Sequence, residues 1–116
     1  MDLKVEGKKV KDILVIYLKG ELDHHTAGDV RTYMDNKLED PTIKNIVLDI
    51  GELGFMDSSG IGVLIGRYKI VSNRGGKLGV AHINSHIHRI FEVSGLYKII
   101  KPYKGLQEAL NDMGGH

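Results

Sequence analysis

The sequence predicts an α/β fold in which helices pack on one mixed β-sheet. Residues 46–50 form a nearly continuous apolar run of strand length, which is typical of a strand buried on both faces of a parallel sheet. After residue 26, segments with apolar residues at helical spacing alternate with further strand-like segments. Such alternation implies parallel strands joined by right-handed crossovers.

The N-terminal segments predict a β-hairpin. Residues 3–6 and 13–18 have the pattern of strands, and Gly-Lys-Lys at residues 7–9 is expected to be the turn between them. Because the connection is short, the two strands are expected to pair antiparallel. Residues 20–25 are expected to form a polar loop.

A first helix is expected to start at Thr26. Thr26 and Asp29 resemble a capping box that has Asp in place of the usual Glu. The apolar stripe of this helix consists of Ala27, Val30, Met34 and Leu38. Pro41 lies just beyond the expected end, because proline cannot continue a helix.

The remaining elements repeat the same alternation. A second helix is predicted from Ile61, Leu64, Ile65, Tyr68 and Val71, with a stop at residues 73–76. Residues 78–83 and 99–103 have the pattern of strands, a short helix ends near Gly95, and residues 106–113 predict a last helix. The predicted order is ββαβαβαβα.

Length and composition exclude several classes of protein. A chain of 116 residues buries roughly two-thirds of its unfolded surface and has room for one core. Sixteen Lys and Arg against fifteen Asp and Glu give a net charge of +1, which argues against direct nucleic-acid binding. The absence of cysteine excludes disulfides, cysteine zinc sites and thiol catalysis.

The same patterns bear on localisation. Charged residues alternate with apolar ones at the N-terminus, so no secretory signal is expected. No apolar run approaches the roughly 18 residues that span a membrane. We therefore expect a cytoplasmic protein without membrane attachment.

The segment most informative about function is Phe-Met-Asp-Ser-Ser-Gly-Ile-Gly at residues 55–62. It follows the apolar strand and leads into the second helix, and functional groups gather at the carboxyl ends of such strands. The simplest interpretation is that Asp57, Ser58 or Ser59 caps the helix. A serine at an exposed helix start can also accept a regulatory phosphate, since the local N–H groups favour an anion.

Two enzymatic or ligand-binding interpretations fit the segment less well. A serine-hydrolase elbow would need Gly-x-Ser-x-Gly, and the first glycine is missing, although His24, His25 and Asp23 offer a base and an acid. A dinucleotide loop would need Gly-x-Gly-x-x-Gly, whereas Gly60, Gly62 and Gly66 have a different spacing. Close packing of Gly62 and Gly66 against the sheet would explain these two glycines better.

The chain resembles the STAS-domain anti-anti-sigma factors, and most closely the anti-sigma-F factor antagonists of endospore-forming bacteria. The resemblance rests on Gly-Glu-Leu-Asp-His-His-Thr-Ala at residues 20–27 together with residues 55–62, and it continues at residues 66–69 and 94–100. It implies a single STAS domain over residues 1–116 with the strand and helix order given above.

The resemblance also implies a mechanism. The unphosphorylated antagonist binds an anti-sigma factor that is a serine kinase, and this binding releases the sporulation sigma factor. The kinase uses ATP to phosphorylate Ser58, and a PP2C-type phosphatase reverses the modification. The protein is then a substrate and regulator rather than an enzyme, with no catalytic residues, metal or cofactor of its own.

The partner-binding surface implied by the resemblance combines two segments. Its residues are Glu21, Asp23, His24, Met56, Asp57, Ser58, Ser59, Gly60, Ile61 and Gly62. Asp23 is expected to offer a carboxylate to a basic group of the partner, and Gly60 and Gly62 to let the partner's backbone come close. The alternative interpretation is that Asp23 is an ordinary solvated loop acid without a role in binding.

Two further interpretations remain. His82, His86 and His88 span a strand end and a helix start without an acid nearby in sequence, so they are expected to be solvated or capping rather than metal-binding. The alternative function is a general STAS interaction module of a stress-response or transporter-regulating system. Nucleotide binding by the protein itself is left open by the residues.

Overall fold

The computed structural model describes residues 2–114 and contains one mixed sheet of five strands with helices on both faces. The sheet order is β1-β2-β3-β4-β5, with β1 antiparallel to β2 and all other neighbours parallel. The strands are β1 (Leu3–Val10), β2 (Ile13–Leu22), β3 (Asn45–Met56), β4 (Leu78–Ala81) and β5 (Ile100–Tyr103). The predicted mixed sheet is confirmed.

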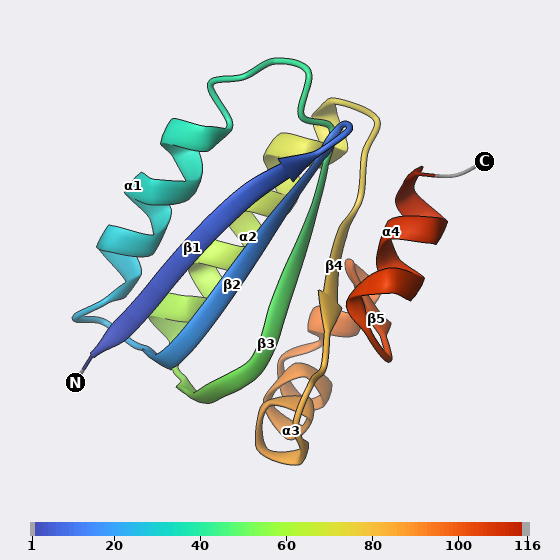
Figure 1. Ribbon diagram of the computed structural model, residues 1–116. Helices are drawn as coiled ribbons and strands as arrows, with labels where there is room; N and C mark the ends of the chain where they lie inside the picture. The colour runs from blue at the N-terminus through green and yellow to red at the C-terminus, as the bar shows by residue number, and fades with distance from the viewer. Residues whose placement is uncertain (1, 115–116) are drawn as a thin grey trace.

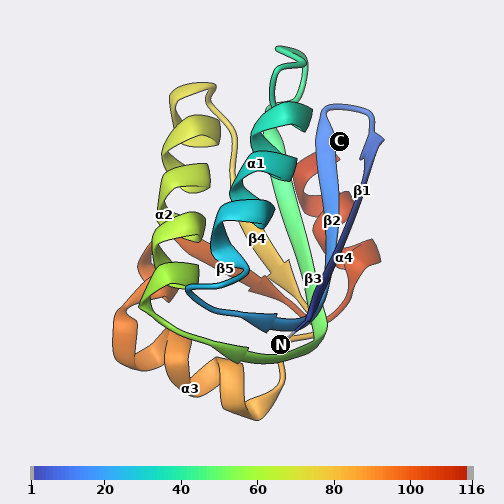
Figure 2. The ribbon, with the colours of Figure 1, turned by 90° about the vertical axis from the view of Figure 1, so that its left-hand side faces the viewer.

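The helices divide unequally between the two faces of the sheet. They are α1 (Ala27–Lys37), α2 (Ser58–Asn73), α3 (Ser85–Ser94) and α4 (Leu106–Gly114), with a short 3-10 turn, η1 (Leu96–Lys98). Figures 1 and 2 show α1 and α2 side by side on one face, α3 at the end of the sheet, and α4 on the other face. The predicted order ββαβαβαβα is confirmed.

Two apolar clusters follow from this layering. The larger lies between the sheet and α1, α2 and α3, and includes Leu48, Val30, Leu64 and Phe91. The smaller lies under α4 and includes Val15, Val47, Ala81, Tyr103 and Met113. Because β3 contributes to both clusters, its apolar run is buried on both faces, as the sequence predicts.

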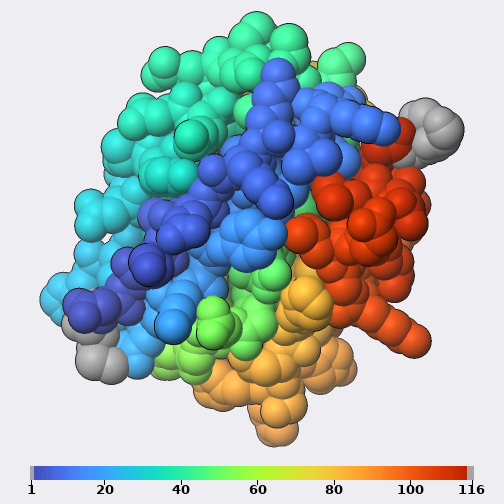
Figure 3. Space-filling model, in the orientation of Figure 1, coloured from blue at the N-terminus to red at the C-terminus, as the bar shows by residue number. Residues whose placement is uncertain are grey.

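The hairpin turn differs from the prediction. β1 continues through residues 7–9, and the turn consists of Lys11 and Asp12, since Val10 pairs with Ile13. Gly7 is a strand residue instead of the predicted turn residue, and its N–H donates a hydrogen bond to the hydroxyl of Tyr33 at 2.7 Å. Lys11 instead adopts the positive φ, 56°, that the reversal needs. In the space-filling view of Figure 3, β1 runs diagonally across the surface beside α1, and β2 lies between β1 and α4.

The strands that lead to the candidate site are longer than predicted. β3 runs on to Met56 and β2 to Leu22, so the polar loop after β2 is only residues 23–26. Leu53 and Met56 are buried, while the residues between them are exposed. Because two register shifts interrupt the pairing of β2 with β3, this extension lacks the regular alternation that would have revealed it.

Candidate functional site

The loop after β2 and the start of α2 meet at the carboxyl ends of two parallel strands. Leu22 pairs with Met56 in the sheet. The Asp57 N–H then donates to the Leu22 carbonyl at 3.2 Å, and the His24 N–H donates to Oδ2 of Asp57 at 3.2 Å. Parallel pairing therefore brings together the two segments that the sequence singles out.

Asp57 caps helix α2. Its backbone is extended, with φ −114° and ψ −170°, and its Oδ1 accepts hydrogen bonds from the N–H groups of Ser59 at 2.9 Å and Gly60 at 3.3 Å. The helix-cap interpretation is correct and the capping residue is Asp57. Since Oδ2 is bonded to His24, the same carboxylate joins the helix start to the preceding loop.

Ser58, the first residue of α2, is exposed. Among residues 2–114, no hydrogen bond is found to its hydroxyl, and no histidine lies in hydrogen-bond contact with it. A serine hydrolase needs a base hydrogen-bonded to the nucleophile. The arrangement instead presents a free hydroxyl beside a helix N-terminus, where added negative charge is favoured by the helix dipole.

Asp23 is not a solvated loop acid. It is only 8% exposed, and its Oδ1 accepts hydrogen bonds from the N–H groups of His25 at 2.8 Å and Thr26 at 3.1 Å. Partial burial acts to raise the pKa of Asp23, but these backbone hydrogen bonds outweigh it and the net pKa is lowered. The carboxylate thus holds its own loop together through Oδ1, and only Oδ2 is left to bind a group of the partner.

Thr26 does not form the predicted capping box. Its hydroxyl donates to the carbonyl of Glu21 at 2.7 Å and accepts from the N–H of Asp23 at 3.0 Å, and its side chain makes no cap to α1. The hydroxyl is drawn into the loop because the loop is tight and needs those two groups satisfied. The sequence pattern was correct in placing the helix start and wrong about the cap.

The residues of the implied partner surface lie at different depths. Ser58, His24 and Gly62 are exposed, and Glu21, Asp57, Ser59 and Ile61 are half-buried. Met56 is 3% exposed and Gly60 is also buried. These two residues support the surface from beneath, so the idea that Gly60 admits a partner's backbone is wrong.

Gly60 is required by packing within the chain. A Cβ at this position would lie 2.6 Å from Cγ of Met56 and 2.8 Å from Cγ of Leu22, closer than carbon atoms approach. The expected close packing of Gly62 and Gly66 against the sheet is wrong, because a Cβ at either meets nothing within 4 Å. The glycine that brings α2 onto the ends of β2 and β3 is therefore Gly60.

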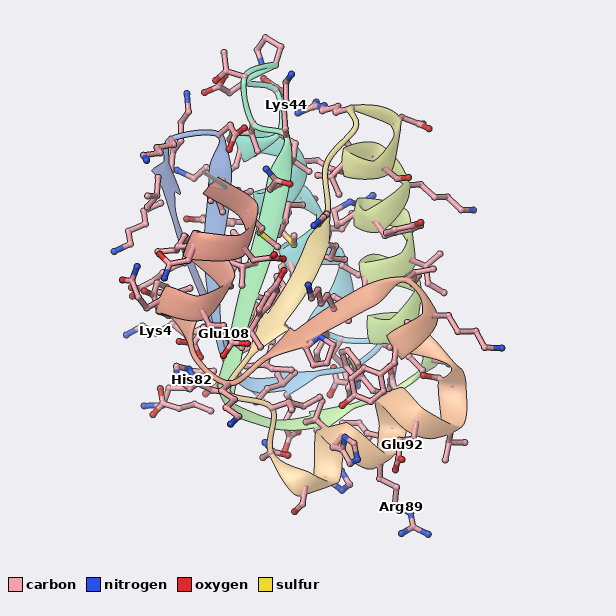
Figure 4. The ribbon with its side chains drawn as sticks, turned by 90° about the vertical axis from the view of Figure 1, so that its right-hand side faces the viewer. Lys4, Lys44, His82, Arg89, Glu92 and Glu108 are labelled. Atoms are coloured by element: carbon pink, nitrogen blue, oxygen red, sulfur yellow. The ribbon has the colours of Figure 1, made fainter. Side chains whose placement is uncertain are left out.

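Two of the three histidines at positions 82, 86 and 88 have separate polar neighbours, and His86 is exposed. Nδ1 of His82 lies 3.2 Å from Oδ1 of Asp49, beside the carboxyl end of β4 (Figure 4). His88 lies between the Tyr97 hydroxyl, 2.6 Å away, and Glu92, 3.3 Å away. Within the described part of the chain, no three His, Asp or Glu side chains are grouped closely enough to hold a metal ion.

The bridging role of Asp57 and its contact with His24 could not be predicted from the sequence. The segment Asp-Ser-Ser-Gly carries the signal for a cap, but nothing in it indicates which backbone groups the second oxygen will reach. Among the helices of residues 2–114, none has the length and apolar character needed to cross a membrane.

Comparison with known proteins identifies the family of the chain. Residues 4–109 match the family described as STAS domain. The chain is 41% identical over 113 residues to an anti-sigma F factor antagonist of Paenibacillus polymyxa, covering 97% of each. Its fold is similar to that of the anti-sigma factor antagonist SpoIIAA in its unphosphorylated form (TM-score 0.77, 23% identity, 99% and 100% of the two chains).

A second SpoIIAA structure, from Bacillus and in the phosphorylated form, is 26% identical and has a TM-score of 0.72, with coverage of 96% of this chain and 98% of that one. The match in sequence to the Paenibacillus polymyxa protein is nearly full-length, and the matches in fold cover almost the whole of each chain. The chain belongs to the STAS-domain family, among the anti-sigma factor antagonists.

Proposed function

We propose that the unphosphorylated chain binds an anti-sigma factor that is also a serine kinase, and so releases a sporulation sigma factor in the cytoplasm. The observation that carries this proposal is Ser58, an exposed serine at the start of α2 whose hydroxyl makes no hydrogen bond within residues 2–114. The 41% identity to an anti-sigma F factor antagonist supports the sigma-F system. A relative solved in a phosphorylated form supports control by phosphorylation.

Phosphorylation of Ser58 would weaken partner binding through the position of the added charge. A phosphate adds a charge of about −1.5 to −2, next to the carboxylate of Asp57. That carboxylate already accepts from the N–H groups of Ser59 and Gly60, so these donors are not free to bind the phosphate. A partner that fits a neutral hydroxyl must then desolvate an uncompensated anion, which costs several kcal/mol and lowers affinity by orders of magnitude.

The proposed cycle needs no enzymatic activity, cofactor or metal in this chain. ATP is used by the partner kinase, and a PP2C-type phosphatase removes the phosphate. The protein acts through protein contacts and not through nucleic acid.

The assignment of Ser58 is tested by incubating the protein with its cognate anti-sigma factor and labelled ATP. Wild type and Ser59→Ala should accept label at Ser58, while Ser58→Ala should accept none and remain bound. Full labelling of Ser58→Ala would show that a residue other than Ser58 accepts the phosphate. Absence of label on the wild type would favour the general interaction module over the kinase substrate.

A binding measurement tests the consequence of the added charge. Ser58→Asp should bind the anti-sigma factor more weakly than wild type, whereas Ser72→Asp, an exposed serine near the far end of α2, should bind equally well. Equal affinity for Ser58→Asp and wild type would argue that Ser58 lies outside the contact.

A further inference from the structure

A groove between α1 and α2 lies next to the surface around Ser58. It has a volume of about 400 Å³, and its lining residues are Ala27, Gly28, Arg31, Ser59, Gly62, Val63 and Arg67. Figure 2 shows the two helices side by side on one face of the sheet. Ser59 and Gly62 belong both to this groove and to the implied partner surface, so the two are continuous.

Arg67 is an unusual residue to find in this groove. It is only 8% exposed, and arginine keeps its charge in proteins. Its Nε lies 3.1 Å from Oδ1 of Asp35, but within residues 2–114 neither Nε nor Nη1 makes a hydrogen bond. A buried guanidinium with so few acceptors is costly, and an oxyanion in the groove would supply acceptors.

Arg31 adds a second cation to the groove. It is exposed on α1, and no ion pair of Arg31 is found in the described part of the chain. Asp35 offsets one of the two positive charges, so the groove retains a net positive charge. A planar guanidinium fork is suited to a carboxylate.

The walls leave room for a side chain of a docked protein. Gly28 and Gly62 are exposed, and a Cβ added to either meets nothing within 4 Å. The opening therefore exists because neither helix places a side chain there. Its volume of about 400 Å³ is ample for one acidic side chain together with water.

We infer that this groove receives an aspartate or glutamate of the protein partner, which pairs with Arg31 and Arg67. The inference rests on the proposed function, because the partner is the anti-sigma factor that contacts Ser58. It adds a second anchor, on the side of α2 that faces α1. The carboxylate would be partly desolvated between the helices, where a charge-assisted hydrogen bond is strongest.

The test measures the dissociation constant of the unphosphorylated protein for the anti-sigma factor by calorimetry. Arg31→Glu should weaken binding about tenfold or more, since it places a like charge opposite the partner's carboxylate. Lys8→Glu is the matched control, because Lys8 is exposed on β1 and no hydrogen bond or ion pair of its side chain is found within residues 2–114. It should change the dissociation constant less than about twofold.

A size series tests occupancy without changing charge. Gly28→Leu should fill the groove and weaken binding about tenfold, whereas Gly28→Ala should have little effect. Both variants should fold, because Gly28 is exposed and a Cβ there meets no described atom within 4 Å; urea unfolding checks this. Wild-type affinity for both Arg31→Glu and Gly28→Leu would overturn the inference.

A double-mutant cycle identifies the partner's acid. Each acidic residue of the anti-sigma factor is changed to alanine and combined with Arg31→Ala; one of them should show a less-than-additive loss of about fivefold or more. If none couples, the groove does not receive a carboxylate. If the wild type fails to bind the anti-sigma factor, the proposed function is wrong. If the wild type binds and the groove variants bind equally well, only the inference about the groove is wrong.

Discussion

The backbone N–H of His24 donates a hydrogen bond of 3.2 Å to Oδ2 of Asp57, a residue 33 positions later in the chain. Oδ1 of the same carboxylate accepts from the N–H groups of Ser59 and Gly60. One side chain thus holds the start of α2 and the loop after β2 in a common position. The exposed hydroxyl of Ser58 lies directly beside this junction in sequence, so its surroundings depend on Asp57.

Replacing Asp57 should destabilise the protein and loosen the loop. Asp57→Ala removes three hydrogen bonds that the carboxylate accepts, two of which cap the helix, and should lower the free energy of unfolding by about 1–2 kcal/mol. Asp57→Asn keeps the Oδ1 acceptor and should cost less. Urea unfolding measures both variants, and hydrogen exchange at the N–H of His24 should speed up in Asp57→Ala. Unchanged exchange at His24 would contradict the bridging role.

Substitution by alanine should change stability in opposite directions at Gly60 and Gly62, which lie two residues apart on α2. Gly60→Ala drives a Cβ to 2.6 Å from Cγ of Met56 and 2.9 Å from the carbonyl oxygen of Leu22, and should destabilise by about 1–3 kcal/mol. Gly62→Ala meets nothing within 4 Å and should stabilise by up to about 1 kcal/mol through helix propensity. Thermal unfolding of the pair provides a matched comparison. The same sign for both would refute the packing argument.

These two glycines also illustrate what the sequence could predict. The apolar runs and helical stripes determined the order of elements, because burial acts on many residues at once. Gly60 and Gly62 look alike in sequence, and only the approach of Leu22 and Met56, from two other strands, distinguishes them. Likewise, the family pattern located Ser58 and Asp57, but the positions of Thr26 and Asp23 depend on backbone groups that become available only when the loop closes.

The stability of the loop after β2 should depend on pH through Asp23. Its folded-state pKa is lowered by the N–H donors of His25 and Thr26 against the opposing effect of burial, so the unfolded state binds protons more readily. The contribution is therefore fully present above the ordinary pKa of about 3.9 and is lost as the pH falls through the lower folded value.

The variant Asp23→Asn tests this dependence. It should be less stable than wild type at neutral pH, and the difference should shrink as the pH falls below about 4. Glu52→Gln, at an exposed carboxylate for which no hydrogen bond or ion pair is found in residues 2–114, is the control and should follow the wild type. Urea unfolding at a series of pH values measures the difference. A constant difference between Asp23→Asn and wild type down to pH 2 would contradict the assigned hydrogen bonds.

Adding negative charge at Ser58 should leave the fold intact. The side chain is exposed, no internal hydrogen bond of its hydroxyl would be broken, and the helix dipole favours an anion in the first turn. The unfolding free energy of Ser58→Asp should therefore stay within about 0.5 kcal/mol of wild type. Backbone amide shifts of the phosphorylated protein should change at residues 23–26 and 56–62, because Asp57 connects these segments, and remain unchanged in α4 on the opposite face of the sheet. Shifts throughout α4 would mean that the phosphate remodels the domain, and inhibition of binding would then come from a conformational change instead of from the charge at the contact surface.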